Sequence, residues 1–163
     1  MLGSRSSFFK RSKEDLNRSH RQMVRYLVSN NYSLLQIGIY EKAFEYFCNY
    51  PNSYDGATVV KDNCHIHELD LNAMLHDYHH IVYKAACNLH TKWTCDLIYY
   101  NEIKRMQIKG VKKWRIKWVA ISRFTLLKTF GIPFLIYSRI TKGKPSDQQK
   151  RRLYSDYIIL TKN

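Results

Sequence analysis

The chain has 163 residues, of which 45% are apolar, and carries a formal net charge of +14. A single domain of this size buries a core of its own, so folding needs neither disulfides nor a metal. The sequence contains no Gly-rich phosphate loop, no GxSxG motif and no dinucleotide fingerprint, which excludes the enzyme classes that depend on these motifs.

The charge is distributed unevenly along the chain. Residues 104–152 hold fifteen Lys or Arg and one acid, residues 31–103 hold four and nine, and residues 1–30 hold seven and two. An acidic centre therefore lies between two cationic segments. Such segments attract phosphate groups, either of nucleic acid or of lipid headgroups.

The four cysteines show no CxxC spacing, and no secretory signal peptide is recognisable. We therefore expect reduced thiols and a cytosolic location. A disulfide between Cys87 and Cys95 is the alternative.

The N-terminal part predicts two helices. Residues 1–11 are basic, and we expect them to form a flexible arm before a helix capped by Ser12. Ser33 and Gln36 form a capping box that begins a second helix, and Pro51 ends it. The second helix carries an apolar stripe that predicts a core face: Ile37, Tyr40, Phe44 and Phe47.

Residues 52–63 read as a loop, in which Ala57 to Val60 form a short strand. We expect this strand to pair with Leu153 to Leu160 in a minor two-stranded β element. A third helix is predicted over Glu68 to Ala86, with Asp70 as its N-cap.

Two further helices follow. The first is capped by Thr91 or Thr94 and ends at Lys109 before Gly110. The second runs from Val111 to Phe130 and is ended by Gly131 and Pro133. The fold class is thus mainly α, with one helical domain over residues 12–140 and a basic linker with a C-terminal segment over residues 141–163.

The segment that begins at Val111 is apolar, but it is too interrupted by charges and by Gly-Pro to be a transmembrane helix. Its aromatic and basic residues favour an interfacial helix that contacts a membrane or nucleic acid: Lys112, Lys113, Trp114, Arg115, Lys117 and Trp118. The alternative is a core helix with a basic outer face.

The third and fourth helices carry the chemically distinctive residues. One face of the third helix presents His76, His80, Tyr83 and Cys87, and one face of the fourth presents Asp96, Tyr100 and Ile103. Two helices joined by a short loop pack antiparallel, so a carboxylate on one can orient a histidine on the other as a general base. Two carboxylates could orient His76. If the third helix stops near Tyr83, Asp96 lies opposite His76, whereas in a symmetric hairpin Glu102 lies opposite it.

The elements His76-Asp77, Tyr83 and Asp96 resemble the helix pair of secreted phospholipase A2, in its shorter prokaryotic and parvoviral forms. The resemblance implies that His76 activates water and that Asp96 orients it, with Tyr83 and Tyr100 in support. It also implies that Asp77 and the backbone of a loop containing Gly56 bind Ca²⁺, which polarises the ester carbonyl.

A second resemblance covers roughly residues 69–131. The pattern HDY, then CDLIYYNEIKRM, then KGVKKWR and KTFG is similar to a family of small tailed-phage proteins of unknown function. It implies a phage origin and the helical hairpin.

A zinc site is the metal alternative. Cys64, His65, His67, His76, His79 and His80 are dense in the sequence, and His76 with His80 has the i, i+4 spacing of zinc ligands on a helix. No third ligand stands at a diagnostic spacing.

We therefore expect a phage-derived protein that performs Ca²⁺-dependent hydrolysis of lipid esters at an anionic membrane. The alternative is a non-enzymatic virion or accessory protein whose basic arms bind nucleic acid, an acidic partner or phage structural proteins; a membrane-active toxin without catalysis is a third. The expected location is the host cytoplasm or the virion, at the periphery of a membrane.

Overall fold

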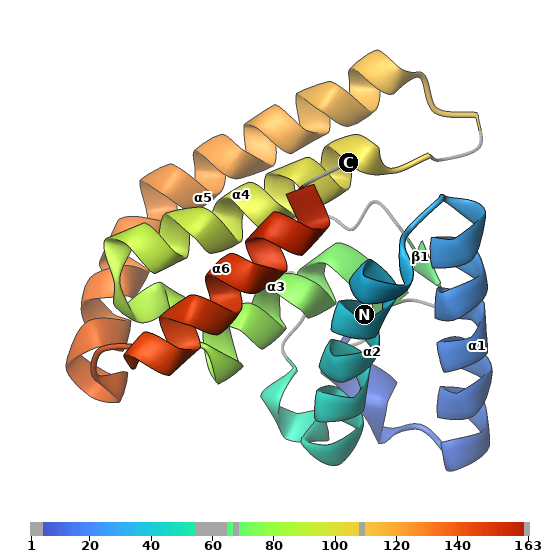
Figure 1. Cartoon of the computed structure of the whole chain (residues 1–163), viewed down its shortest axis with the longest axis horizontal. Helices are drawn as coiled ribbons and strands as arrows, with labels where there is room; N and C mark the ends of the chain where they lie inside the picture. The colour runs from blue at the N-terminus through green and yellow to red at the C-terminus, as the bar shows by residue number, and fades with distance from the viewer. Residues whose placement is uncertain (1–4, 55–64, 67–68, 108–109, 162–163) are drawn as a thin grey trace. The chain divides into compact units, whose positions relative to one another are not determined.

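The computed structural model describes residues 5–54, 65–66, 69–107 and 110–161. Helices dominate it, which confirms the prediction of a mainly α protein (Figure 1). The chain divides into two compact units, Met1–Asp77 and Tyr78–Asn163. The division falls inside α3 (Leu71–Val82), which is one continuous helix.

The first unit is built on α1 (Lys13–Ser29) and α2 (Leu34–Asn49), which pack against each other. Ser12 caps α1, and Ser33 with Gln36 forms the predicted capping box of α2. The chain leaves α2 through the short 3-10 helix η2 (Pro51–Ser53), so Pro51 stands where the helix was expected to end. The four residues of the predicted α2 stripe are all buried: Ile37, Tyr40, Phe44 and Phe47.

An aromatic cluster fills the core of this unit. The ring of Phe9 lies 5.0–5.4 Å from four neighbours: Phe8, Phe44, Phe47 and Tyr54. Phe8 and Phe9 belong to the 3-10 helix η1 (Arg5–Lys10), within the segment expected to be a flexible arm. The segment is structured because the two rings bury a large apolar area against α2 and η2.

A short antiparallel ribbon, β1 (His65–Ile66) with β2 (Leu69–Asp70), leads into α3. The expected two-stranded element is placed differently. Ala57 to Val60 lie outside the described residues, and Leu153 to Leu160 are helical, so the pairing of Leu153 to Leu160 as a strand is wrong. Asp70 caps α3 as predicted, because its Oδ1 accepts hydrogen bonds from the backbone N–H groups of Asn72 and Ala73.

The second unit begins with the end of α3 at Val82, four residues before the predicted end. Lys84 takes the left-handed conformation, and the 3-10 helix η3 (Ala85–Cys87) follows. Asn88, rather than Thr91 or Thr94, then caps α4 (Leu89–Arg105) by accepting from the backbone N–H groups of His90 and Thr91. The Thr91 hydroxyl instead donates to the carbonyl of Ala85.

Helix α4 is central to the second unit, since it packs against both α5 (Lys113–Lys142) and α6 (Asp147–Thr161) (Figure 1). Helix α6 occupies much of the segment expected to be a basic linker. A capping box begins it, in which Ser146 and Gln149 exchange backbone and side-chain hydrogen bonds. Leu153 and Leu160 are its buried residues.

Helix α5 continues through Gly131 and Pro133, where we predicted its end. It bends by 48° between its parts Lys113–Thr129 and Gly131–Lys142. Proline removes a backbone donor and kinks a helix without necessarily ending it when other groups satisfy the backbone. Near the bend, the ammonium of Lys92 donates to the carbonyl of Leu127 at 2.9 Å.

Gly131 makes room for this lysine. A Cβ atom built on Gly131 would overlap Cε and Nζ of Lys92, whereas a Cβ on Gly38 in α2 meets no atom within 4 Å. The bent part of α5 therefore depends on a glycine for steric reasons.

We predict that Gly131→Ala lowers the free energy of unfolding by about 1–3 kcal/mol, because the new methyl group displaces the buried Lys92 side chain. Gly38→Ala is the matched control, and it should raise stability by up to about 1 kcal/mol through helix propensity. Urea unfolding followed by circular dichroism measures both. A gain of stability in both variants would contradict the proposed steric role.

Candidate functional site

The outer face of α5 carries a row of exposed apolar side chains. Its members follow helical spacing on the face opposite the buried residues Ile116, Ala120 and Arg123. We call this row the outer stripe: Trp114, Trp118, Ile121, Ile132, Ile136 and Ile140. Trp118 is 65% exposed and Ile140 is 79% exposed. Large apolar side chains aligned on one solvent-facing side of a helix indicate an interaction surface.

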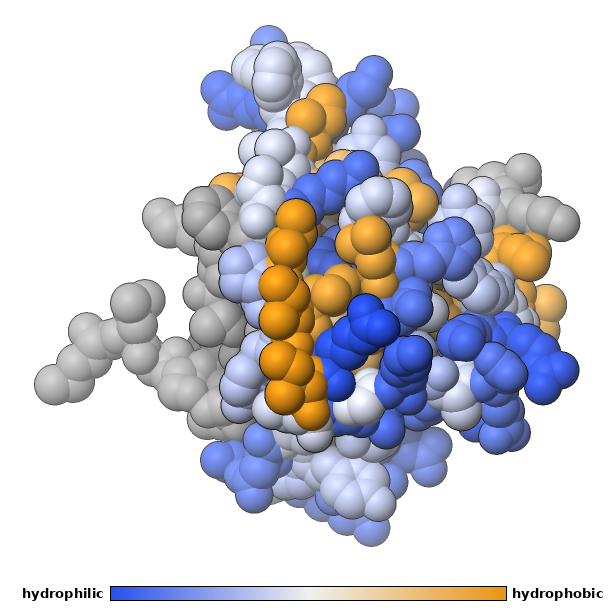
Figure 2. Space-filling model, turned by 90° about the vertical axis from the view of Figure 1, so that its left-hand side faces the viewer, coloured by the Kyte–Doolittle hydropathy of each residue, from blue (hydrophilic) through white to orange (hydrophobic). Residues whose placement is uncertain are grey.

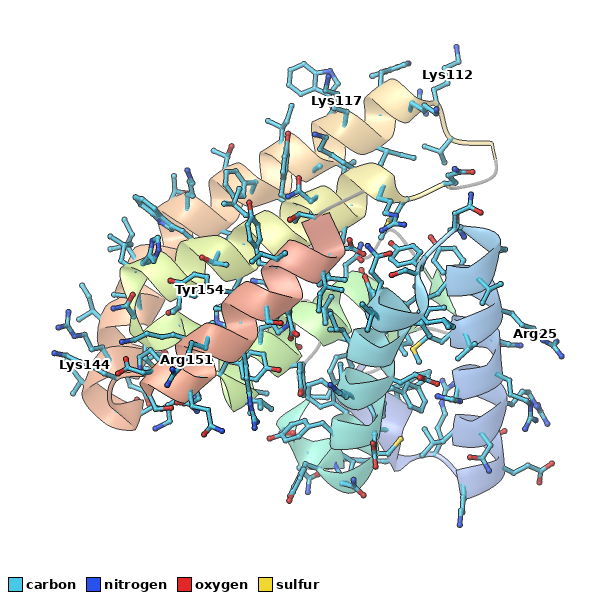
Figure 3. The ribbon with its side chains drawn as sticks, viewed as in Figure 1. Arg25, Lys112, Lys117, Lys144, Arg151 and Tyr154 are labelled. Carbon is cyan, nitrogen blue, oxygen red and sulfur yellow. The ribbon has the colours of Figure 1, made fainter. Side chains whose placement is uncertain are left out.

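Cations flank the outer stripe at both ends. Lys112, Lys113, Arg115 and Lys117 surround its first turns, and Arg139, Lys142 and Lys144 surround its last ones. Lys112 and Lys117 lie at one end of α5 and Lys144 lies just beyond the other (Figure 3). No acidic residue occurs between Glu102 and Asp147 in the sequence. All six predicted surface residues are exposed around the first turns of α5.

A hollow of about 320 Å³ adjoins the start of α5. Four of its seven lining residues are cationic; the seven are Lys104, Arg105, Met106, Gln107, Lys113, Ile116 and Lys117. A cationic recess with an apolar floor suits a phosphate group attached to an apolar body.

Apolar side chains also gather on the face of the molecule shown in Figure 2, where they form a row beside strongly hydrophilic groups. No single helix among the described residues has the length and apolar content needed to cross a membrane. The two parts of α5 meet both criteria only when taken together across their bend.

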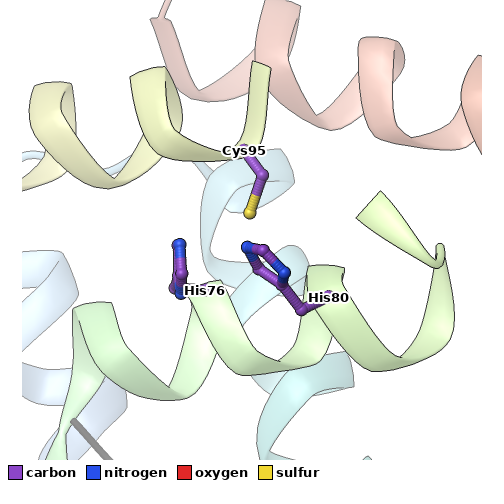
Figure 4. Close-up of side chains that lie close together, drawn as sticks. All are labelled: His76, His80 and Cys95. Atoms are coloured by element: carbon purple, nitrogen blue, oxygen red, sulfur yellow. The ribbon is translucent and has the colours of Figure 1, made fainter. Parts of the chain in front are cut away.

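The histidines of α3 form a second group of interest. His76 and His80 lie one turn apart on this helix, and each is partly buried. Together with Cys95 of α4 they offer three ligand atoms that all lie within 4.8 Å of one another (Figure 4). Cys95 is completely buried and forms no disulfide, as is also true of Cys87, so the bridge between them is not formed.

His79 lies beside this group and is completely buried. Its Nε2 lies 3.2 Å from Oδ2 of Asp156 in α6, and its ring stacks on Tyr83 at 5.5 Å. Burial lowers the pKa of His79, but the hydrogen bond to Asp156 and the contact with Cys95 raise it, and the net direction is upward. Burial and the nearby Asp156 raise the pKa of Tyr83 above its usual range, so its phenol stays protonated.

Asp96, which was predicted to orient His76, is buried on α4. Its Oδ2 accepts a hydrogen bond from the ammonium group of Lys92 at 2.5 Å. His76 has its Nδ1 3.9 Å from Oδ1 of Asp77, its neighbour in sequence. That Asp96 orients His76 stays a prediction. The rival orienter, Glu102, is also buried on α4.

The remaining predicted residues are dispersed. Tyr100 packs against Phe124 of α5 at 5.2 Å, beneath the ammonium group of Lys104. Gly56, the expected backbone ligand of Ca²⁺, lies outside the described residues. Asp77 lies on α3 beside His76. A calcium site formed by Asp77 and Gly56 therefore stays a prediction.

The sequence did not predict three of the contacts in the structure. Cys95 lies near His76 and His80, Asp156 contacts His79, and Lys92 pairs with Asp96. Two signals were present. Cys95 follows the helical spacing of the buried α4 residues Thr91, Ile98 and Glu102, which indicates that it faces a neighbouring element. Lys92 and Asp96 have the i, i+4 spacing of a helical ion pair.

Comparison with known proteins finds no matching family model, no matching curated protein and no matching solved structure. The resemblances to phospholipase A2 and to the phage family therefore stay predictions.

We predict that Lys92→Met lowers the free energy of unfolding by about 3–5 kcal/mol, because it leaves the Asp96 carboxylate buried without its cation. The double variant Lys92→Met/Asp96→Leu should lose less than Lys92→Met alone, since it removes both charges. Denaturant unfolding measures both, and Lys150→Met, at an exposed ion pair, is the control that should change little. Equal losses in Lys92→Met and the double variant would contradict a buried ion pair.

Proposed function

We propose that this protein binds the surface of anionic phospholipid membranes through the outer face of α5. The observation that supports the proposal is the outer stripe, six exposed apolar side chains flanked by cations and by no carboxylate over the length of the helix. An amphipathic helix of this kind lies in the plane of the bilayer, with its apolar side chains among the acyl chains and its cations at the headgroups. Tryptophans such as Trp114 and Trp118 favour this interface.

The charge of the surface favours a membrane over a second copy of the chain. An isologous dimer through the outer stripe would bring the flanking cations of both copies together, with no acid on either helix to neutralise them. An anionic bilayer supplies the opposite charge, worth about 1 kcal/mol for each Lys or Arg near its surface.

The hollow beside the first turn of α5 supports the same assignment. Lys104 and Arg105 at the end of α4 meet Lys113 and Lys117 there, close to the exposed Trp114. These side chains provide several donors for one phosphate.

We predict that replacing both Trp114 and Trp118 with Ala weakens binding to vesicles of anionic phospholipid by about tenfold or more, because two interfacial side chains no longer enter the bilayer. Changing Lys112, Lys113 and Lys117 to Gln should weaken binding by about 100-fold and reduce its salt dependence. Co-sedimentation with vesicles at several salt concentrations measures both effects.

The matched control is Leu34→Ala/Leu35→Ala. These two side chains of α2 are also strongly exposed and apolar, but Lys42 is the one Lys or Arg in the sequence of that helix, so binding should not change. Equal losses in the control and in the tryptophan variant, or equal binding to zwitterionic vesicles, would reject the proposal. Competition by duplex DNA at low salt would favour nucleic acid as the partner.

Hydrolysis of lipid esters is a second candidate function. His76 favours it, because its imidazole is partly exposed and has the Asp77 carboxylate beside it. A membrane-bound α5 would also bring the chain to its substrate.

We predict that, if this activity exists, fatty acid is released from mixed micelles by the wild type with Ca²⁺ and is abolished by EGTA or by His76→Ala. His20→Ala is the control, since His20 lies on α1 beside Glu41. Absence of release by the wild type, or equal release by His76→Ala, would reject hydrolysis while leaving membrane binding untouched.

A further inference from the structure

We propose that His76, His80 and Cys95 bind one Zn²⁺ ion. This site is independent of the membrane surface on α5, and it differs from the calcium site that the sequence led us to expect. Its donors are two imidazoles and a thiolate, which suit Zn²⁺, whereas Ca²⁺ binds oxygen ligands.

The helix α3 holds the two histidines in place. The spacing of His76 and His80 by four residues puts both rings on one side of a single continuous helix. Their relative position is therefore set by helix geometry alone. Cys95 then approaches from α4, in the same compact unit as His80.

The distances suit a tetrahedral ion after a small adjustment. The three ligand atoms lie within 4.8 Å of one another. With Zn–N bonds of about 2.0–2.1 Å and Zn–S bonds of about 2.3 Å, the donor atoms of a tetrahedral site lie roughly 3.3–3.6 Å apart. Binding therefore requires the donor atoms to approach one another by up to roughly 1.2–1.5 Å, which rotation of the three side chains would supply.

The surroundings match the donors. The carboxylate Oδ1 of Asp77 lies 3.9 Å from Nδ1 of His76, so a small movement would let it accept the imidazole N–H, as acids commonly do beside zinc-bound imidazoles. On the other side, Cys95 contacts His79, which Asp156 holds in position.

The burial of the three ligands suggests how the ion enters. Cys95 is inaccessible, but His76 and His80 are each partly exposed. The ion reaches the thiolate from the histidine side. Three protein ligands leave one position of a tetrahedral ion for a ligand from solution.

The test is metal binding to the purified full-length protein after treatment with chelator. One equivalent of Co²⁺, a spectroscopic substitute for Zn²⁺, should produce tetrahedral d–d bands and a thiolate-to-metal charge-transfer band, and Zn²⁺ should displace it. Cys95→Ser should remove the charge-transfer band. His76→Gln or His80→Gln should weaken metal affinity by more than about 100-fold, which exceeds the loss expected when a residue that only hydrogen-bonds a metal ligand is replaced. Saturating Zn²⁺ should raise the melting temperature of the wild type by several degrees.

Two matched controls separate this site from other donors. Cys64→Ser removes a thiol that adjoins His65 and His67 in the sequence, and His90→Gln removes an exposed histidine of α4; both should bind Co²⁺ as the wild type does. If Cys95→Ser fails to fold, X-ray absorption of the zinc-loaded wild type decides, since it should show one sulfur at about 2.3 Å with nitrogen or oxygen neighbours. A spectrum without sulfur, or loss of binding in Cys64→Ser but not in Cys95→Ser, would overturn the proposal.

Discussion

A buried ammonium group organises the second unit. Lys92 reaches from α4 to the Asp96 carboxylate on its own helix and to the Leu127 carbonyl of α5, through space that Gly131 leaves open. A buried charge is stable only when it is paired and hydrogen-bonded, so the three contacts constrain one another. They hold α4 and α5 together at the bend of α5, and the outer stripe faces away from that contact.

Neighbouring residues of α4 face different helices. Successive side chains on a helix are separated by about 100°. Asp96 therefore points toward Lys92 and α5, while Cys95 points toward the histidines of α3. The ion pair of Lys92 with Asp96 and the proposed zinc ligand Cys95 thus lie on different faces of α4. A substitution in one of them need not alter the other.

Local signals predicted the caps of α1, α2 and α3, whereas the cap of α4 is Asn88 rather than Thr91 or Thr94. The caps at Ser12, Ser33 and Asp70 are present because a side-chain oxygen next to unsatisfied backbone N–H groups stabilises a helix wherever it occurs. The capping box at Ser146 and Gln149 is the same signal. The basic residues around it favour a linker and the apolar residues after it favour a strand, so the sequence pattern obscures this signal.

Helix ends and side-chain partners were predicted poorly. Gly131 and Pro133 are strong local stop signals, yet α5 continues with a bend, and Lys92 from a distant part of the sequence occupies the space beside the glycine and donates to the Leu127 carbonyl. Likewise, the sequence predicted that His76 and His80 share one helix face but did not indicate a third ligand. No local pattern shows which residue of α4 lies opposite these histidines of α3.

The sequence by itself determined the helical class, the caps at Ser12, Ser33 and Asp70, the clustering of positive charge and the face shared by His76 and His80, because each depends on residues within a few turns of one another. Only the tertiary structure decided that Cys95 meets these histidines, that Asp156 holds His79 and that Lys92 joins α4 to α5. Those contacts join residues far apart in the chain. Their formation depends on how whole helices bury their surfaces, which no local pattern encodes.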